Sequence, residues 1–79
     1  MSPTVFRERG YRFFFFSREE PRMHVHVQSG QGEAKFWLVP EIALAANYGL
    51  RPKELSIIEG IIRERASEIQ SAWNQHFGS

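Results

Sequence analysis

Hydrophobic and polar residues alternate along the first half of the chain, which is the pattern of β-strands with one buried face. Residues 4–7 and 11–16 are rich in aromatic and other apolar residues, as strands are, and flank Arg9 and Gly10. Glycine adopts the positive φ that a tight turn needs, so the two segments predict a β-hairpin. Three cross-strand pairs are expected in this hairpin: Glu8 with Tyr11, Phe6 with Phe13, and Val5 with Phe14.

The second of these segments is apolar on both of its faces. Phe13 and Phe15 lie on one face of the predicted strand. Phe14 and Phe16 lie on the other face. A chain of 79 residues can cover one of these faces with its own helices but has little left to cover the second. We therefore expect the second face to meet another subunit or a partner protein.

Two further strands are predicted at residues 23–27 and 33–38, joined by a turn rich in glycine at residues 28–32. His24 and His26 stand two residues apart, so both imidazoles leave the same face of the first of these strands. Antiparallel pairing that sets like faces together allows two registers. The two registers are His26 opposite Glu33 with His24 opposite Lys35, or His26 opposite Lys35 with His24 opposite Trp37.

The second half of the chain changes to helical periodicity. Residues 40–48 predict a short, alanine-rich helix that ends at Gly49. Pro52 fits the first turn of a longer helix. Gly60, in the middle of that helix, indicates either close packing or a weak point that costs about 1 kcal/mol relative to alanine. The apolar residues of the longer helix recur every three or four positions: Leu55, Ile58, Ile62, Ala66, Ile69, Trp73 and Phe77.

These elements predict an α+β fold in a single domain spanning residues 1–79. Two β-hairpins over residues 4–38 form an antiparallel sheet of about four strands. A short and a long C-terminal helix over residues 40–77 pack on one face of that sheet. The apolar run at residues 13–16 is too short to span a bilayer, and the N-terminus lacks the pattern of a secretory signal. A cytoplasmic protein with no membrane contact is therefore expected.

The composition limits the available chemistry. Without cysteine, neither a disulfide nor a thiolate metal site can form. The net charge of +1 is too balanced to require a nucleic-acid partner. The basic residues are nevertheless concentrated near the N-terminus, which is compatible with an anionic partner or with a solvated hairpin edge. Five arginines fall in the first 22 positions: Arg7, Arg9, Arg12, Arg18 and Arg22.

A candidate catalytic patch follows from either register of the second hairpin. The patch contains a carboxylate, which raises the pKa of a nearby imidazole, and a lysine, which lowers it. A base, an acid and a cation are what metal-independent cleavage of a phosphodiester needs. The candidate catalytic residues are His24, His26, Glu33 and Lys35.

Two other interpretations of the same face remain open. His24 and His26 form a His-x-His element that could bind a metal ion with Glu33 as the third ligand. Alternatively, an exposed Trp37 is typical of a binding surface, unless residues 73–77 cover it. The candidate binding residues in this second interpretation are Trp37, Arg22, Phe14 and Phe16.

Four motifs give the chain a family resemblance. They are Gly-Tyr-Arg-Phe-Phe-Phe at 10–15, His-Val-His-Val at 24–27, Ala-Lys-Phe-Trp at 34–37 and Ala-Trp-Asn-Gln-His-Phe at 72–77. The chain resembles small bacterial proteins grouped as domain of unknown function 4160 (DUF4160) over essentially its whole length. The resemblance implies no biochemical activity. It does imply a genetic arrangement, because members often form one half of a two-gene pair suggestive of toxin–antitoxin modules.

The favoured functional hypothesis is a protein-binding component of such a two-gene module. It would use the Phe-rich face to dimerise or to hold a cognate small protein encoded nearby, and no cofactor is expected. The alternatives are a small ribonuclease-type toxin acting through the catalytic patch and a metal-binding protein. Binding is favoured because only Arg22 and Lys35 add basic charge near the histidines, where a nuclease needs a stronger basic surface.

Overall fold

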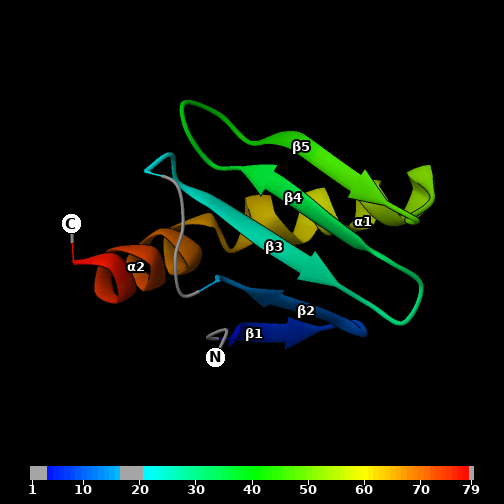
Figure 1. Cartoon of the computed structure of the whole chain (residues 1–79), viewed down its shortest axis with the longest axis horizontal. Helices are drawn as coiled ribbons and strands as arrows, with labels where there is room; N and C mark the ends of the chain where they lie inside the picture. Colours follow the sequence, from blue (N-terminus) through cyan, green and yellow to red (C-terminus); the bar gives the residue numbers. More distant parts are fainter. Residues whose placement is uncertain (1–3, 17–20, 79) are drawn as a thin grey trace.

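The computed structural model describes residues 4–16 and 21–78 and has an α+β architecture. Five strands form one antiparallel sheet in which each strand lies beside its neighbour in the sequence (Figure 1). The strands are β1 Thr4–Glu8, β2 Tyr11–Phe14, β3 His24–Gln28, β4 Glu33–Trp37 and β5 Ala43–Tyr48. The helices are α1 Pro52–Glu64 and α2 Ala66–Phe77. The predicted fold class is confirmed, with five strands in the sheet where about four were expected.

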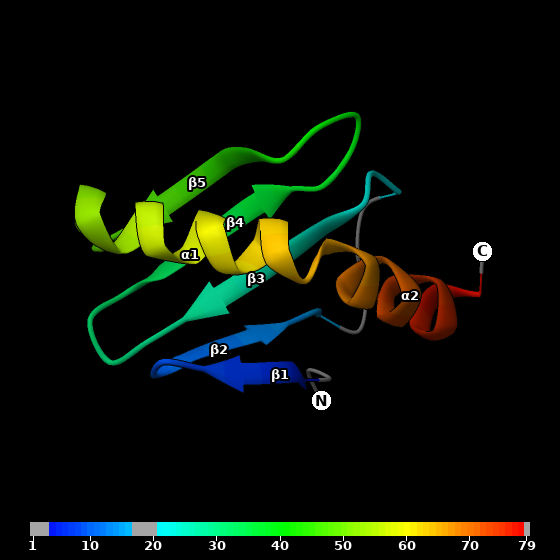
Figure 2. The same ribbon diagram turned by 180° about the vertical axis from the view of Figure 1, so that it is seen from behind.

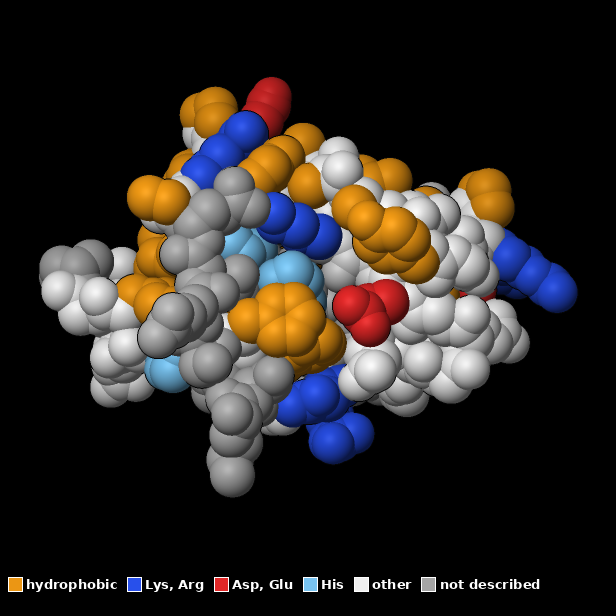
Figure 3. Space-filling model, in the orientation of Figure 1, with side chains coloured by type: hydrophobic (Ala, Val, Ile, Leu, Met, Phe, Trp, Pro, Cys, Tyr) orange, Lys and Arg blue, Asp and Glu red, His pale blue; other side chains and the backbone are white. Residues whose placement is uncertain are grey.

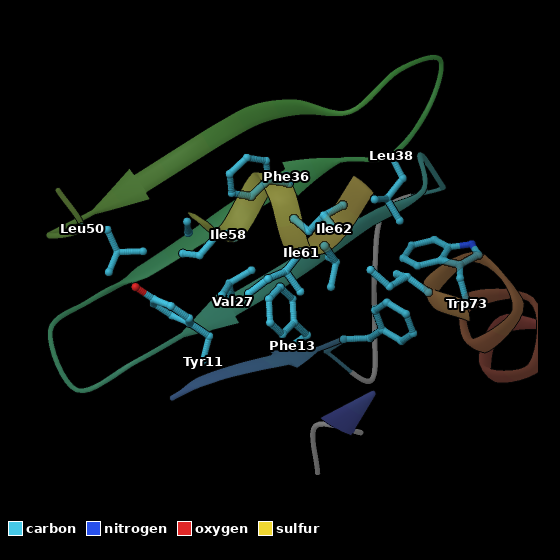
Figure 4. Packing of buried hydrophobic residues seen from close by; sticks show 14 residues of the cluster. Tyr11, Phe13, Val27, Phe36, Leu38, Leu50, Ile58, Ile61, Ile62 and Trp73 are labelled. Atoms are coloured by element: carbon cyan, nitrogen blue, oxygen red, sulfur yellow. The ribbon is translucent and has the colours of Figure 1, made fainter. Parts of the chain in front are cut away.

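The helices bury one face of the sheet. Figure 2 shows α1 crossing in front of β3 and β4 in this view from behind, while α2 continues past the end of the sheet where β3 begins. Phe13, Val27 and Phe36 point from the sheet toward Ile58 and Ile62 of α1, and all five are fully buried (Figure 4). Each such side chain contributes about 1.5–3 kcal/mol by leaving water. The two-residue period of the strands and the helical period of α1 thus meet in one core.

The prediction of a short helix at residues 40–48 is wrong, because residues Ala43–Tyr48 form strand β5. Alanine favours helix intrinsically, but β4 has backbone groups on its outer side that need partners. Strand β5 supplies those partners along the whole length of β4, from Glu33 opposite Tyr48 to Trp37 opposite Ala43. Tertiary pairing therefore outweighed local propensity.

The long helix predicted from Pro52 onward is divided at Arg65 into α1 and α2. Arg65 has a φ of −115° and a ψ of 23°, which is not helical. Its Nη1 donates to Glu8 at 2.9 Å, its Nε donates to Glu68 at 2.8 Å, and its guanidinium lies 3.5 Å from the centre of the Phe6 ring. The break therefore fixes the helices against strand β1.

Gly60 is exposed in α1, and a Cβ atom there would meet no atom within 4 Å. Of the two interpretations of this glycine, the structure therefore supports the weak point rather than close packing. Neither described helix combines the length and the apolar character that crossing a membrane requires.

The strand registers settle the pairings that the sequence left open. In the first hairpin, Glu8 faces Tyr11 and Phe6 faces Phe13, as predicted. The predicted pair of Val5 with Phe14 is wrong, because a register shift between Thr4 and Phe6 places Thr4 opposite Phe14. The second hairpin adopts the second of the two registers: His26 lies opposite Lys35 and His24 lies opposite Trp37.

Candidate functional site

The face of the sheet opposite the helices, which we call the open face, is built from three rows of paired residues. Paired residues of antiparallel strands point to the same face, so each row crosses the sheet. The first row is Arg7, Arg12, Gln28, Glu33 and Tyr48. The second row is Thr4, Phe14, His26, Lys35 and Ala46. The third row is His24, Trp37 and Ala43, and two neighbours complete the open face: Phe16 beside His26, and Arg22 beside Trp37.

An aromatic cluster lies near the middle of the open face. The His26 ring stacks on Phe14 at a centroid distance of 5.5 Å and meets the Phe16 ring edge-on at 4.3 Å. Phe14 and His26 are buried, whereas the Phe16 side chain is 40% exposed. Figure 3 views this face and shows histidine side chains beside hydrophobic ones. Phe16 therefore presents the cluster to the surface.

His24 is fully buried between two tryptophans. Its ring lies 5.6 Å from Trp37 on β4 and 5.1 Å from Trp73 on α2, so the open face and the helical layer meet at this residue. The His24 Nδ1 atom lies 2.7 Å from the carbonyl oxygen of Arg22. Because a carbonyl oxygen accepts and cannot donate, Nδ1 carries the proton. This hydrogen bond fixes the orientation of the imidazole.

Two cations hold the half-buried Trp37 ring. The Arg22 guanidinium lies 4.1 Å from the ring centre and the Lys35 ammonium lies 4.4 Å from it. Arg22 is also oriented by its Nε, which donates to the carbonyl oxygen of Val39 at 2.9 Å. Such cation–π contacts are worth about 0.5–1 kcal/mol each at exposed sites. Two cations of the open face therefore contact the Trp37 ring. Trp73, near the C-terminus, contacts His24.

Arg12 adds a third cation–π contact. Its guanidinium lies 4.4 Å from the centre of the Phe14 ring, and its Nε donates to Thr4 Oγ1 at 2.7 Å. The hydrogen bond joins β2 to the edge strand β1. It holds the Arg12 guanidinium over the aromatic cluster.

Charge is unevenly distributed over the described part of the chain. The open face carries four cations and one carboxylate: Arg7, Arg12, Arg22 and Lys35, with Glu33. The other described surfaces carry five cations and six carboxylates. In Figure 3, blue side chains accordingly lie above and below the pale blue histidines. The open face therefore has a positive potential that the overall charge of the chain conceals.

The four predicted catalytic residues lie on the open face but do not form one constellation. His26 and Lys35 are directly opposite each other, and the His24 ring lies 5.0 Å from the His26 ring. Glu33 lies opposite Gln28 and not opposite a histidine. A general base must reach the proton that it removes, and the burial of His24 prevents direct contact with a substrate.

The proposed metal ligands are similarly placed. Glu33, the third candidate ligand beside His24 and His26, stands in a different row from either histidine. Across residues 4–16 and 21–78, no three histidine, cysteine, aspartate or glutamate side chains are grouped so that they could hold a metal ion.

Sequence reasoning did not assign several members of the open face to the candidate site, among them Arg7, Arg12 and Tyr48. Strand alternation places Arg12 on the same face as Phe14, so that pattern already contained the signal. Tyr48 could not be found in this way, because its segment has the composition of a helix and forms strand β5.

Comparison with known families identifies a model described as domain of unknown function (DUF4160), which matches residues 10–74. The match includes all open-face residues except Thr4 and Arg7. No curated protein and no solved structure shows significant similarity to the chain.

Proposed function

The chain belongs to the DUF4160 family, and from this premise and the geometry of the open face we propose that it is a protein-binding component of a two-gene, toxin–antitoxin-like module. The family resemblance supplies the expectation of a partner encoded nearby. The observation that carries the proposal is the open face itself, where aromatic rings and four cations occupy the side of the sheet that the helices leave bare.

The partner expected on this face is an acidic protein. A surface with four cations and one carboxylate attracts a negatively charged partner and repels a positive one. Tryptophan, tyrosine and arginine are also the residues that contribute most to the centres of protein interfaces. The open face contains all three types in Trp37, Tyr48 and Arg22.

A nucleic acid shares the negative charge but fits the rings less well. Proteins bind single-stranded nucleic acid by stacking bases on accessible aromatic faces. Here the Phe14 ring lies against His26 and under Arg12, and the Trp37 ring is contacted by Arg22 and Lys35. Because the protein's own side chains already occupy these ring faces, a protein partner is favoured.

The test is binding to the protein encoded by the neighbouring gene, measured by titration calorimetry. We expect Phe16→Ala to raise the Kd about 30-fold, which corresponds to about 2 kcal/mol for a central anchor residue. Arg22→Ala should weaken binding and reduce its dependence on salt, because it removes one open-face cation. Val39→Ala is the matched control, because Val39 is a similarly exposed hydrophobic residue outside the open face.

Two results would contradict the proposal. One is the absence of a complex between the chain and the neighbouring gene product. The other is an equal loss of affinity in Phe16→Ala and Val39→Ala. Thermal unfolding of each variant shows whether the fold is retained.

The ribonuclease-type alternative rests on the pairing of His26 with Lys35, which brings a base and a cation together on the open face. Expression of the chain alone in bacteria tests it. Growth arrest that is relieved by His26→Gln and retained by Phe16→Ala favours catalysis. Absence of arrest, together with a stable complex with the neighbouring gene product, favours the binding role.

A further inference from the structure

The two edges of the sheet differ in their protection against further pairing. Strand β1 ends the sheet on one side and carries Arg7 and Glu8, of which Glu8 is held by Arg65. Strand β5 ends it on the other side, and its sequence Ala-Leu-Ala-Ala-Asn-Tyr contains no charge and no proline. Charges and prolines are the usual devices that keep an edge strand from pairing with another chain.

A register shift occurs in both edge ladders, so irregularity alone does not distinguish them. The difference lies in charge, which β1 has and β5 lacks. Backbone N–H and C=O groups on the outer side of β5 are therefore accessible to a further strand without an electrostatic barrier.

Exposed hydrophobic side chains gather at the β5 edge. Among the described residues, four large hydrophobic side chains are exposed: Phe16, Val39, Leu44 and Tyr48. Leu44 and Tyr48 belong to β5, with exposed fractions of 46% and 69%, and Val39 lies in the segment that leads into it. The small side chains of Ala43 and Ala46 stand on the same strand and leave room for a neighbouring strand.

We infer that a second copy of this chain adds its own β5 to this edge in the antiparallel direction, so that two five-stranded sheets join edge to edge. Such an interface is isologous, since the same strand contributes on both sides of a twofold axis. The axis is perpendicular to the sheet, so both open faces lie on the same side of the dimer.

The charges of the two surfaces favour this edge-to-edge dimer over a dimer in which the two open faces are in contact. Two open faces in contact would oppose two sets of four cations. Two β5 strands in contact oppose no charges. The second copy therefore belongs at the edge, and the open face remains available to the acidic partner. The inference rests on a different feature from the proposed function, the outer backbone edge of β5, although Tyr48 also belongs to the open face.

Analytical ultracentrifugation of the full chain tests the dimer. A six-residue strand makes a small interface, so association should depend on concentration over about a hundredfold range. We expect the mass of the unmodified chain to rise to twice the monomer mass of 9.2 kDa. Leu44→Lys and Tyr48→Lys, made separately, should each remain at 9.2 kDa. Phe16→Lys is the matched control, because Phe16 is a similarly exposed hydrophobic residue beside His26 and not at β5, and it should dimerise like the unmodified chain.

Amide hydrogen exchange gives a second readout that locates the interface. In the dimer, β5 amides that point outward should exchange at least about tenfold more slowly than in Leu44→Lys. A mass of 9.2 kDa at every concentration of the unmodified chain would overturn the inference. So would full dimerisation of both lysine variants. Neither result affects the partner-binding test, which depends on Phe16 and Arg22.

Discussion

Gly32 lies where the turn between β3 and β4 passes the end of β5. A Cβ atom on Gly32 would collide with the carbonyl oxygen of Tyr48 and lie 2.9 Å from the carbonyl carbon of Gly49. Both obstacles are backbone atoms, which cannot rotate away as a side chain can. Gly30 lies two residues earlier in the same turn, and a Cβ atom there would meet nothing within 4 Å.

We therefore expect Gly32→Ala to lower the free energy of unfolding by about 2 kcal/mol or more, because the clash forces β5 away from the turn. Gly30→Ala should change it by less than about 0.5 kcal/mol. Urea denaturation of both variants measures the difference. Equal effects of the two substitutions would show that β5 does not pack against Gly32.

Tyr11 makes stability sensitive to alkaline pH. Burial of the phenol, the nearby Glu54 carboxylate and a 3.4 Å hydrogen bond to Glu54 Oε1 together raise the pKa of Tyr11 above its ordinary value of 10.0. Both residues line a shallow depression of about 300 Å³ at this end of the sheet. A raised pKa means that the folded state holds the proton more tightly than the unfolded state.

This contribution to stability is therefore fully present below pH 10 and is lost as the pH rises through the folded-state pKa. We expect the free energy of unfolding to fall above about pH 10, and the fall to be smaller in Tyr11→Phe. Tyr48→Phe is the matched control, because that side chain is largely exposed. A pH profile of Tyr11→Phe parallel to that of the unmodified chain would rule out the Tyr11 contribution.

At the scale of secondary-structure elements, the residue between the two helices, Arg65, joins them to strand β1. Arg65 contacts Glu68 of α2 together with Glu8 and the Phe6 ring of β1, and the hydrogen bonds to the two carboxylates raise its pKa further. We expect Arg65→Ala to lower the free energy of unfolding clearly more than Arg63→Ala does, because the charged partners and the ring lose their contact together.

Arg63→Ala is the control for this substitution. Arg63 forms an exposed pair with Glu59 on α1 at 3.0 Å, and such pairs are worth about 0.3–0.5 kcal/mol. Chemical denaturation compares the two variants. Losses of similar size would mean that Arg65 does not fix the helices to β1.

Helix α1 should gain stability at Gly60. An added methyl group at this exposed position meets no neighbouring atom, so Gly60→Ala should raise the free energy of unfolding by about 1 kcal/mol through helix propensity alone. Thermal denaturation gives the shift in Tm. No increase, or a decrease, would show that the glycine serves a purpose other than continuing the helix.

The sequence predicted elements where one local period dominates. The local pattern located β2 from its aromatic residues beside a glycine turn and located β3 and β4 from alternation, and it placed the candidate residues on one face. It failed for residues 40–48, because their alanines favour helix until β4 offers them hydrogen-bond partners. It also failed at Arg65, because the helical period continues across this break, where Arg65 contacts Glu8 and Phe6 of a distant strand.

At the scale of the whole molecule, the open face depends on pairings that the sequence did not specify. The alternation of residues indicated the face of each strand, but two registers of the second hairpin satisfied it equally. The first row runs from Arg7 to Tyr48 and exists only when all five strands are in register. For the same reason, a net charge of +1 gave no indication of a face with four cations.

The sequence-ordered sheet has a consequence for folding. Every strand pairs with the next strand of the chain, so contact order within the sheet is low and each hairpin closes a short loop. The contact between Glu8 and Arg65, in contrast, joins residues 57 positions apart. We expect Arg65→Ala to accelerate unfolding and leave the refolding rate unchanged in stopped-flow experiments, because this contact forms after the transition state. A slower refolding rate would place it in the nucleus. We therefore expect the hairpins of the sheet to form early in folding and the contact between Glu8 and Arg65 to control the unfolding rate.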